Sequence, residues 1–116
     1  MAAVIDTHTH IVDPSNGRYP LRDAGLPTGG WWRHHPSSAE SFLAEMDAAG
    51  VAGAVLVQCK SAYSFDNSYA CDSALAHPAR FVSASIVDAA AADAADQLER
   101  WARAGMHGTR MFDIPT

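Results

Sequence analysis

Short apolar runs alternate with stretches of helical periodicity along the chain, and together they predict four strands and three helices. The apolar runs have strand length and occupy residues 3–10, 52–58, 80–87 and 108–112. Between them, apolar residues recur at helical spacing in residues 37–50, 65–77 and 89–104. The second run is apolar throughout, which is typical of a strand buried on both faces of a parallel sheet. Strands that alternate with single helices predict a parallel sheet with right-handed crossovers.

Residues at the ends of two predicted helices support these boundaries. Ser37 and Glu40 have the spacing of a capping box at the start of the first helix, and Gly50 suits the position just past its end. Asp66 can cap the second helix, and Pro78 prevents it from continuing.

A long connection, residues 11–36, separates the first strand from the first helix. It contains four glycines and four prolines, which exclude a long regular element. A loop of this length in a compact domain usually has a function or is disordered. Its aromatic and charged residues indicate that it packs over something. We expect an active-site lid, and the alternative is a surface loop that packs on itself.

Composition and charge limit the classes of protein that fit. The chain has 116 residues, 48% hydrophobic and 18% charged, which is typical of one soluble globular domain. The net charge is −5 and the basic residues are scattered, which argues against binding to nucleic acid. No apolar run of membrane-spanning length and no signal peptide is seen, so we expect no membrane and a cytoplasmic location. Cys59 and Cys71 fit no zinc motif and are expected to be reduced thiols.

The first strand carries the candidate chemistry. Because side chains alternate along a strand, Asp6, His8 and His10 are expected to point the same way. Two imidazoles about 6–7 Å apart on one face can share a divalent metal or hold a substrate oxygen. The alternative is a pair of solvated histidines where the strand ends.

Other polar residues follow the later strands. In parallel α/β sheets the ligand site lies beyond the carboxyl ends of the strands. That rule brings Gln58, Ser61 and Arg110 to the same end of the sheet as His8 and His10. The chain has no phosphate-binding glycine loop and no G-x-S-x-G nucleophile elbow, which disfavours nucleotide binding and serine hydrolysis.

The residues then resemble a known family. Residues 4–10 are similar to the D-x-H-x-H strand that opens the amidohydrolase superfamily. Residues 18–21 resemble its amidohydrolase-related branch, which includes dicarboxypyrone lactonase and sugar lactonases. Further similar segments cover nearly the whole chain in register: residues 46–51, 54–58, 66–69, 77–81 and 108–110.

The resemblance implies a fold and a metal site. The fold would be a (β/α)₈ TIM barrel with its active site at the C-terminal ends of the strands. His8 and His10 would be catalytic residues and ligands of a divalent metal, such as zinc or manganese, with Asp6 in support. A metal-bound water would attack the substrate. Some lactonases of this branch work without a metal, and there the histidines polarise the lactone carbonyl.

The resemblance also implies which residues bind the substrate. Arg110 would hold a carboxylate, since a guanidinium grips a carboxylate with two hydrogen bonds. The alternative for Arg110 is a structural salt bridge with Asp113 or Asp6. Arg18, Tyr19 and Ser61 are further candidates for contact with a small-molecule substrate.

The length departs from the family pattern. A (β/α)₈ barrel takes about 250 residues, whereas this chain offers about four strands and three helices, which is a partial barrel. The later histidine ligands and the base carboxylate of the last strand have no counterpart here. The chain could be a fragment of a longer protein, a truncated reading frame, a half that pairs with a second copy, or a chain taken in isolation. Two open sheet edges would permit a homodimer.

The expected function is therefore a hydrolase that acts on a lactone, an amide or a similar carboxylated small molecule. The alternative is a truncated, catalytically inactive half-barrel that serves as a metal-binding or dimerising module.

Overall fold

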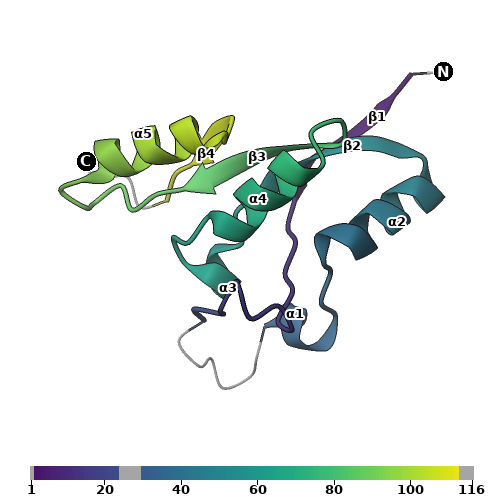
Figure 1. Cartoon of the computed structure of the whole chain (residues 1–116), viewed down its shortest axis with the longest axis horizontal. Coiled ribbons are helices and arrows are strands. Elements are labelled where there is room, and N and C mark those ends of the chain that lie inside the picture. The colour runs from purple at the N-terminus through teal and green to yellow at the C-terminus, as the bar shows by residue number, and fades with distance from the viewer. Residues whose placement is uncertain (1, 24–29, 113–116) are drawn as a thin grey trace.

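Four parallel strands form one open sheet, in the order β1-β2-β3-β4 (Figure 1). The computed structural model describes residues 2–23 and 30–112. Each strand pairs in parallel with the next one along the chain. This confirms the predicted strand order. The strands are β1 (Val4–Thr9), β2 (Val51–Val57), β3 (Phe81–Ile86) and β4 (Gly108–Arg110).

The three predicted helices are present as α2 (Ala39–Ala49), α4 (Ser68–Ala76) and α5 (Ala94–Ala104). Two further helices, α1 (Trp31–His34) and α3 (Lys60–Tyr63), were not predicted. Each has only four residues, which is too short for a hydrophobic period to appear in the sequence.

One face of the sheet carries most of the helical packing. In Figure 1, α2 and α4 lie below the strands, where they contact β2 and β3. The side chains of Ala54 and Leu56 are buried in this layer. Val55 is only partly buried, so the expectation that both faces of this strand are fully covered is wrong for the part of the chain that the structure describes.

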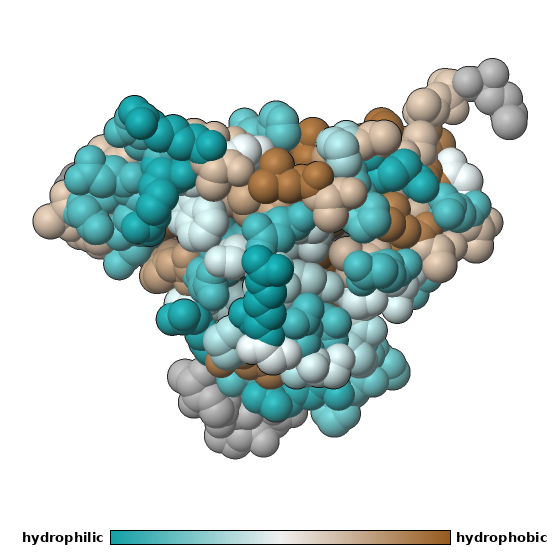
Figure 2. Space-filling view, viewed as in Figure 1, coloured by the Kyte–Doolittle hydropathy of each residue, from teal (hydrophilic) through white to brown (hydrophobic). Residues whose placement is uncertain are grey.

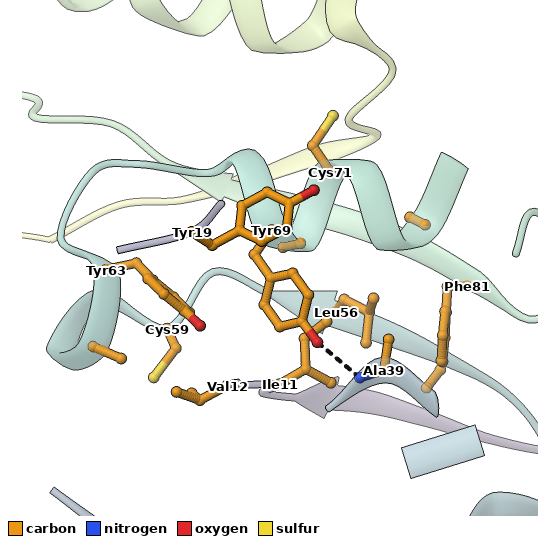
Figure 3. Close-up of a cluster of buried hydrophobic side chains, with 14 of the residues drawn as sticks. Ile11, Val12, Tyr19, Ala39, Leu56, Cys59, Tyr63, Tyr69, Cys71 and Phe81 are labelled. Carbon is orange, nitrogen blue, oxygen red and sulfur yellow. Dashed lines mark hydrogen bonds between the residues drawn. The ribbon is translucent and has the colours of Figure 1, made fainter. Parts of the chain in front are cut away.

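The core between sheet and helices is built around three tyrosines (Figure 3). The ring of Tyr69 lies 4.9 Å from that of Tyr19 and 5.9 Å from that of Tyr63, measured between centroids. The backbone N–H of Ala39 donates a 3.0 Å hydrogen bond to the Tyr69 hydroxyl. The backbone N–H of Asp13 donates a bond of the same length to the Tyr63 hydroxyl. These bonds tie α3 and α4 to the start of α2 and to the long connection.

The start of α2 differs from the predicted capping box by one residue. Ser38 is the N-cap, and its hydroxyl accepts a 3.1 Å hydrogen bond from the backbone N–H of Ser41. Ser37 instead forms an antiparallel bridge with Val12, through backbone bonds of 2.9 and 3.1 Å. That bridge holds Ser37 in extended chain, so it cannot cap the helix. Gly50 ends α2 with a φ of 73°, as predicted.

The first part of the long connection, residues 11–23, packs against the core and against α3. Ile11 and Val12 are buried in the core, and the backbone N–H of Arg22 donates a 2.7 Å bond to the carbonyl of Ala62. Residues 24–29 of this connection lie outside the described residues. The role of residues 11–36 as a lid stays a prediction.

Candidate active site

Two histidines lie together where β1 ends. The ring centroids of His8 and His10 are 5.0 Å apart, and the ring planes are nearly perpendicular, at 87°. The pairing of β1 with β2 is irregular between Asp6 and Thr9, so simple alternation does not hold there. The carboxylate of Asp6 accepts a 3.2 Å hydrogen bond from the backbone N–H of His8. Asp6 therefore contacts the main chain of the histidine pair.

The ring of His10 has a defined tautomer. Its Nδ1 lies 2.9 Å from the carbonyl oxygen of Val57. A carbonyl oxygen can only accept, so Nδ1 carries the proton and the lone pair is on Nε2. Burial lowers the pKa of His10 below its ordinary value, and the nearby His8 and Arg110 act in the same direction. His10 is therefore a neutral imidazole with an available lone pair, which is the form that binds a metal or accepts a proton.

The side chain of His8 meets a residue of the opposite outer strand. Its Nε2 lies 3.4 Å from Nη1 of Arg110 at the end of β4. A guanidinium can only donate, so His8 accepts through Nε2. Three strand spacings separate β1 from β4, about 14 Å, so both side chains must reach over the same face of the sheet. The structure thus brings together the two histidines and Arg110, as the strand-end rule predicts.

The carboxylates proposed as alternative partners of Arg110 are not its described contacts. Asp6 bonds the backbone of His8, and Asp113 lies outside the described residues. Instead, the guanidinium lies over the ring of Phe112, with 4.4 Å between Cζ and the ring centroid.

Ser61 lies near the C-terminal end of β2, exposed within α3. Gln58 also follows β2, but its side chain is only 1% exposed and is used internally. Its Nε2 donates to the carbonyls of Ser64 and Asp66, at 2.9 and 2.8 Å. Gln58 therefore holds the turn that follows α3, and its side chain is not presented to a ligand.

Arg18 and Tyr19 lie against α4 and contact Asp72. The Tyr19 hydroxyl donates a 2.6 Å hydrogen bond to the carboxylate of Asp72, and Nη2 of Arg18 is 3.8 Å from the same oxygen. Burial and Asp72 together raise the pKa of Tyr19 to about 12. The structure does not join these two residues to the histidine pair, and their role in substrate binding remains a prediction.

Two further groups lie beside Arg110 at this end of the sheet. Lys60 is the first residue of α3, just after β2, and its ammonium lies 5.2 Å from the ring centroid of Phe112. The position of Lys60 after a strand could be read from the sequence, but its neighbour could not. Phe112 follows the short strand β4, and nothing in the sequence pattern indicates which side chains its ring meets.

The donors present fit two positions of a metal site. His10 offers a lone pair on Nε2, and the Nε2 of His8 faces Arg110. Catalytic zinc usually takes three protein ligands. Within residues 2–23 and 30–112, no group of three histidine, cysteine or acidic side chains could hold a metal ion. A metal bound to this pair would need its third ligand from elsewhere.

The cysteines take no part in this arrangement. Cys59 and Cys71 are both buried and form no disulfide, as predicted. Burial raises the pKa of both thiols. In the described part of the chain, no helix combines the length and apolar character needed to cross a membrane.

Comparison with known proteins gives a family match and a fold match. A family model described as amidohydrolase matches residues 5–115. No curated protein matches the chain. Among solved structures, the chain is similar to a probable 2-pyrone-4,6-dicarboxylic acid hydrolase from Acinetobacter baumannii, solved with citric acid bound. The identity is 19% and the TM-score 0.68, over 94% of this chain and 37% of that one.

A second similar structure is an apo protein from Agrobacterium tumefaciens. Its identity is 21% and its TM-score 0.66, over 97% of this chain and 38% of that one. The chain therefore spans less than two fifths of the length of either structure. The four parallel strands correspond to half of a TIM barrel, which confirms the predicted partial barrel.

Proposed function

Because this chain belongs to the amidohydrolase family, we propose that it supplies half of a hydrolase active site for a lactone, an amide or a similar carboxylated small molecule. The observation that carries the proposal is the convergence of His8, His10 and Arg110 over one face of the sheet, at the C-terminal ends of its strands. Active sites of α/β barrels lie at this end.

The chemistry of each residue follows from its hydrogen bonds. His10 has its Nδ1 proton engaged and cannot donate from Nε2 while neutral, so it suits metal ligation or proton acceptance better than donation to a carbonyl. His8 and His10 would together hold a divalent metal, which would supply Lewis acidity when bound. Arg110 would hold a carboxylate of the substrate through its planar fork.

The substrate class is argued from charge. Arg110 is a permanently charged group beside the histidine pair, and an anionic substrate would be held there. The similar Acinetobacter protein is described as a dicarboxylic acid hydrolase and was solved with citric acid bound. That description agrees with a carboxylated substrate, but at 19% identity it concerns the other protein.

The competing proposal is a catalytically inactive half-barrel that binds a metal or dimerises. It is favoured by the histidine pair, which among the described residues offers two of the three protein ligands that catalytic zinc usually takes. The two proposals differ in turnover and in the source of the remaining ligands.

The test begins with the solution mass of the purified chain, by light scattering, and its metal content from the same sample. Lactones and amides with a carboxylate group are then assayed with and without added zinc or manganese. The hydrolase proposal expects turnover that His8→Ala and His10→Ala each abolish. His107→Ala is the matched control, because His107 is exposed and precedes β4, at the opposite end of the sheet. Stoichiometric metal without turnover favours the inactive module.

A further inference from the structure

The distribution of ion pairs among the described residues singles out three basic residues. All eight lysine and arginine residues lie in the described part of the chain, and five of them pair with carboxylates: Arg18, Arg22, Arg33, Arg80 and Arg103. Among the described residues, no carboxylate pairs with Lys60, Arg100 or Arg110. Acidic residues outnumber basic ones, 13 to 8, so unpaired cations are not a consequence of too few anions.

Two of these three cations lie over the same aromatic ring. The Lys60 ammonium is 5.2 Å from the centroid of Phe112, and the Arg110 guanidinium carbon is 4.4 Å from it. The Lys60 ammonium is also 5.5 Å from the centroid of Phe65. Aromatic faces attract cations, but two like charges at one ring also repel each other. A bound anion would remove that repulsion.

The turn that follows α3, residues 64–66, is held by the side chains of two buried amides. The side chain of Gln58 donates to the carbonyls of Ser64 and Asp66, and that of fully buried Asn67 donates to the carbonyl of Phe65 at 3.1 Å. Ser64 has a φ of 54°, a conformation that non-glycine residues rarely adopt. Two buried amides therefore hold a strained turn next to Lys60, and such strain is often kept at functional sites.

We propose that Lys60 and Arg110, which both lie over the ring of Phe112, form a two-cation site for anions, in which Lys60 selects ligands that carry a second carboxylate. This inference rests on the proposed function for the claim that the ligand is a substrate. Arg110 grips one carboxylate with its fork and touches His8. Lys60 acts as a point charge on the second carboxylate, from the end of β2. A ligand with a single carboxylate would use Arg110 alone.

The experiment measures binding, independently of turnover. Succinate, monomethyl succinate and dimethyl succinate are titrated into the purified chain at constant low ionic strength, with calorimetry or NMR chemical shifts as the readout. We expect succinate to bind most tightly and the dimethyl ester not to bind. Lys60→Ala and Lys60→Gln should each weaken succinate about five-fold while leaving the monoester nearly unchanged, whereas Arg110→Ala should weaken both acids.

The control is Arg100→Ala, which removes the third unpaired cation. That residue lies on α5 over Trp101, and its loss changes the net charge by the same amount as Lys60→Ala. We expect wild-type affinity for succinate in this variant. The inference is overturned if succinate does not bind, if the Lys60 variants bind it like the wild type, or if Arg100→Ala weakens it equally. His8→Ala should abolish turnover yet keep succinate binding, so a failure of the hydrolase proposal is distinguishable from a failure of this one.

Discussion

Each of the three tyrosines is held in its neutral phenol form. Burial raises the pKa of Tyr19 and Tyr63 to about 12 and also raises that of Tyr69. For Tyr19 the hydrogen bond to Asp72 adds to this effect, because ionisation would place a phenolate beside a carboxylate. The aromatic part of the core therefore depends on phenols that keep their protons.

We predict that the folded chain shows clearly less tyrosinate absorbance at pH 10 than the urea-unfolded chain, which is about half ionised there. As the pH rises past 10, the unfolded state loses phenolic protons that the folded state retains. The free energy of unfolding should therefore fall between pH 10 and about 12. A pH titration by ultraviolet absorbance, with urea melts at each pH, measures both. A folded chain whose tyrosinate absorbance rises at the same pH as that of the unfolded chain would contradict the prediction.

Asn67 is the most heavily bonded buried amide. Its side chain is fully buried and joins the loop to the end of β3. It donates to the carbonyls of Phe65 and Ile86, at 3.1 and 3.0 Å, and accepts from the N–H of Ile86 at 2.8 Å. Removing it leaves buried backbone groups without partners.

We predict that Asn67→Ala lowers the free energy of unfolding by about 2–4 kcal/mol, since several buried polar groups lose their hydrogen bonds. Urea titration followed by circular dichroism measures the change. The matched control is Gln97→Ala on α5, whose amide bonds only the exposed carboxylate of Asp93. We expect that control to lie within about 0.5 kcal/mol of the wild type. Equal effects of the two variants would show that the Asn67 bonds are not stabilising.

At the scale of elements, adjacent serines at the start of α2 differ in role. Ser38 caps the helix through its bond from Ser41. The hydroxyl of Ser37 is buried and has no hydrogen-bond partner among the described residues. We predict that Ser38→Ala costs about 1 kcal/mol of stability, whereas Ser37→Ala is neutral or slightly stabilising. Thermal unfolding of both variants measures the difference. If Ser37→Ala lowered stability more than Ser38→Ala, the helix cap would be Ser37, as predicted from the sequence.

The elements show how far sequence patterns reach. The pattern of apolar residues locates the four described strands and the three long helices, although α5 buries none of its residues and β1 buries only Thr9. They do not locate α1 and α3, which are single turns. The cap of α2 is displaced because Ser37 pairs with Val12, a contact between distant segments that no local signal contains.

The candidate site could likewise be predicted from the sequence only in part. The meeting of His8, His10 and Arg110 follows from topology, since parallel strands deliver their C-terminal residues to one end of the sheet. The position of Arg18 and Tyr19 depends on the path of residues 11–36, which have no period. The sequence pattern places them in that loop but does not indicate Asp72 as their partner.

At the scale of the whole molecule, the sheet is open. Its outer strands β1 and β4 each have one unpaired side among the described strands. The radius of gyration is 14.5 Å, against about 13 Å for a compact domain of this length. Val4, Ile5 and Val82 are 56%, 53% and 38% exposed. Apolar surface is visible along the upper margin of the space-filling view, where the strands lie in Figure 1 (Figure 2).

We predict that the purified chain associates with itself as its concentration rises, because open strands with exposed apolar side chains pair readily. Ile5→Lys should shift the chain toward the monomer, since it places a charge on an outer strand. Leu75→Lys is the matched control, because Leu75 is 55% exposed but lies on helix α4 and not on a strand. Sedimentation velocity over a range of concentrations measures the mass. If wild type stays monomeric, or if both lysine variants dissociate equally, the open sheet is not the surface that associates, and a homodimer could not complete the barrel through it.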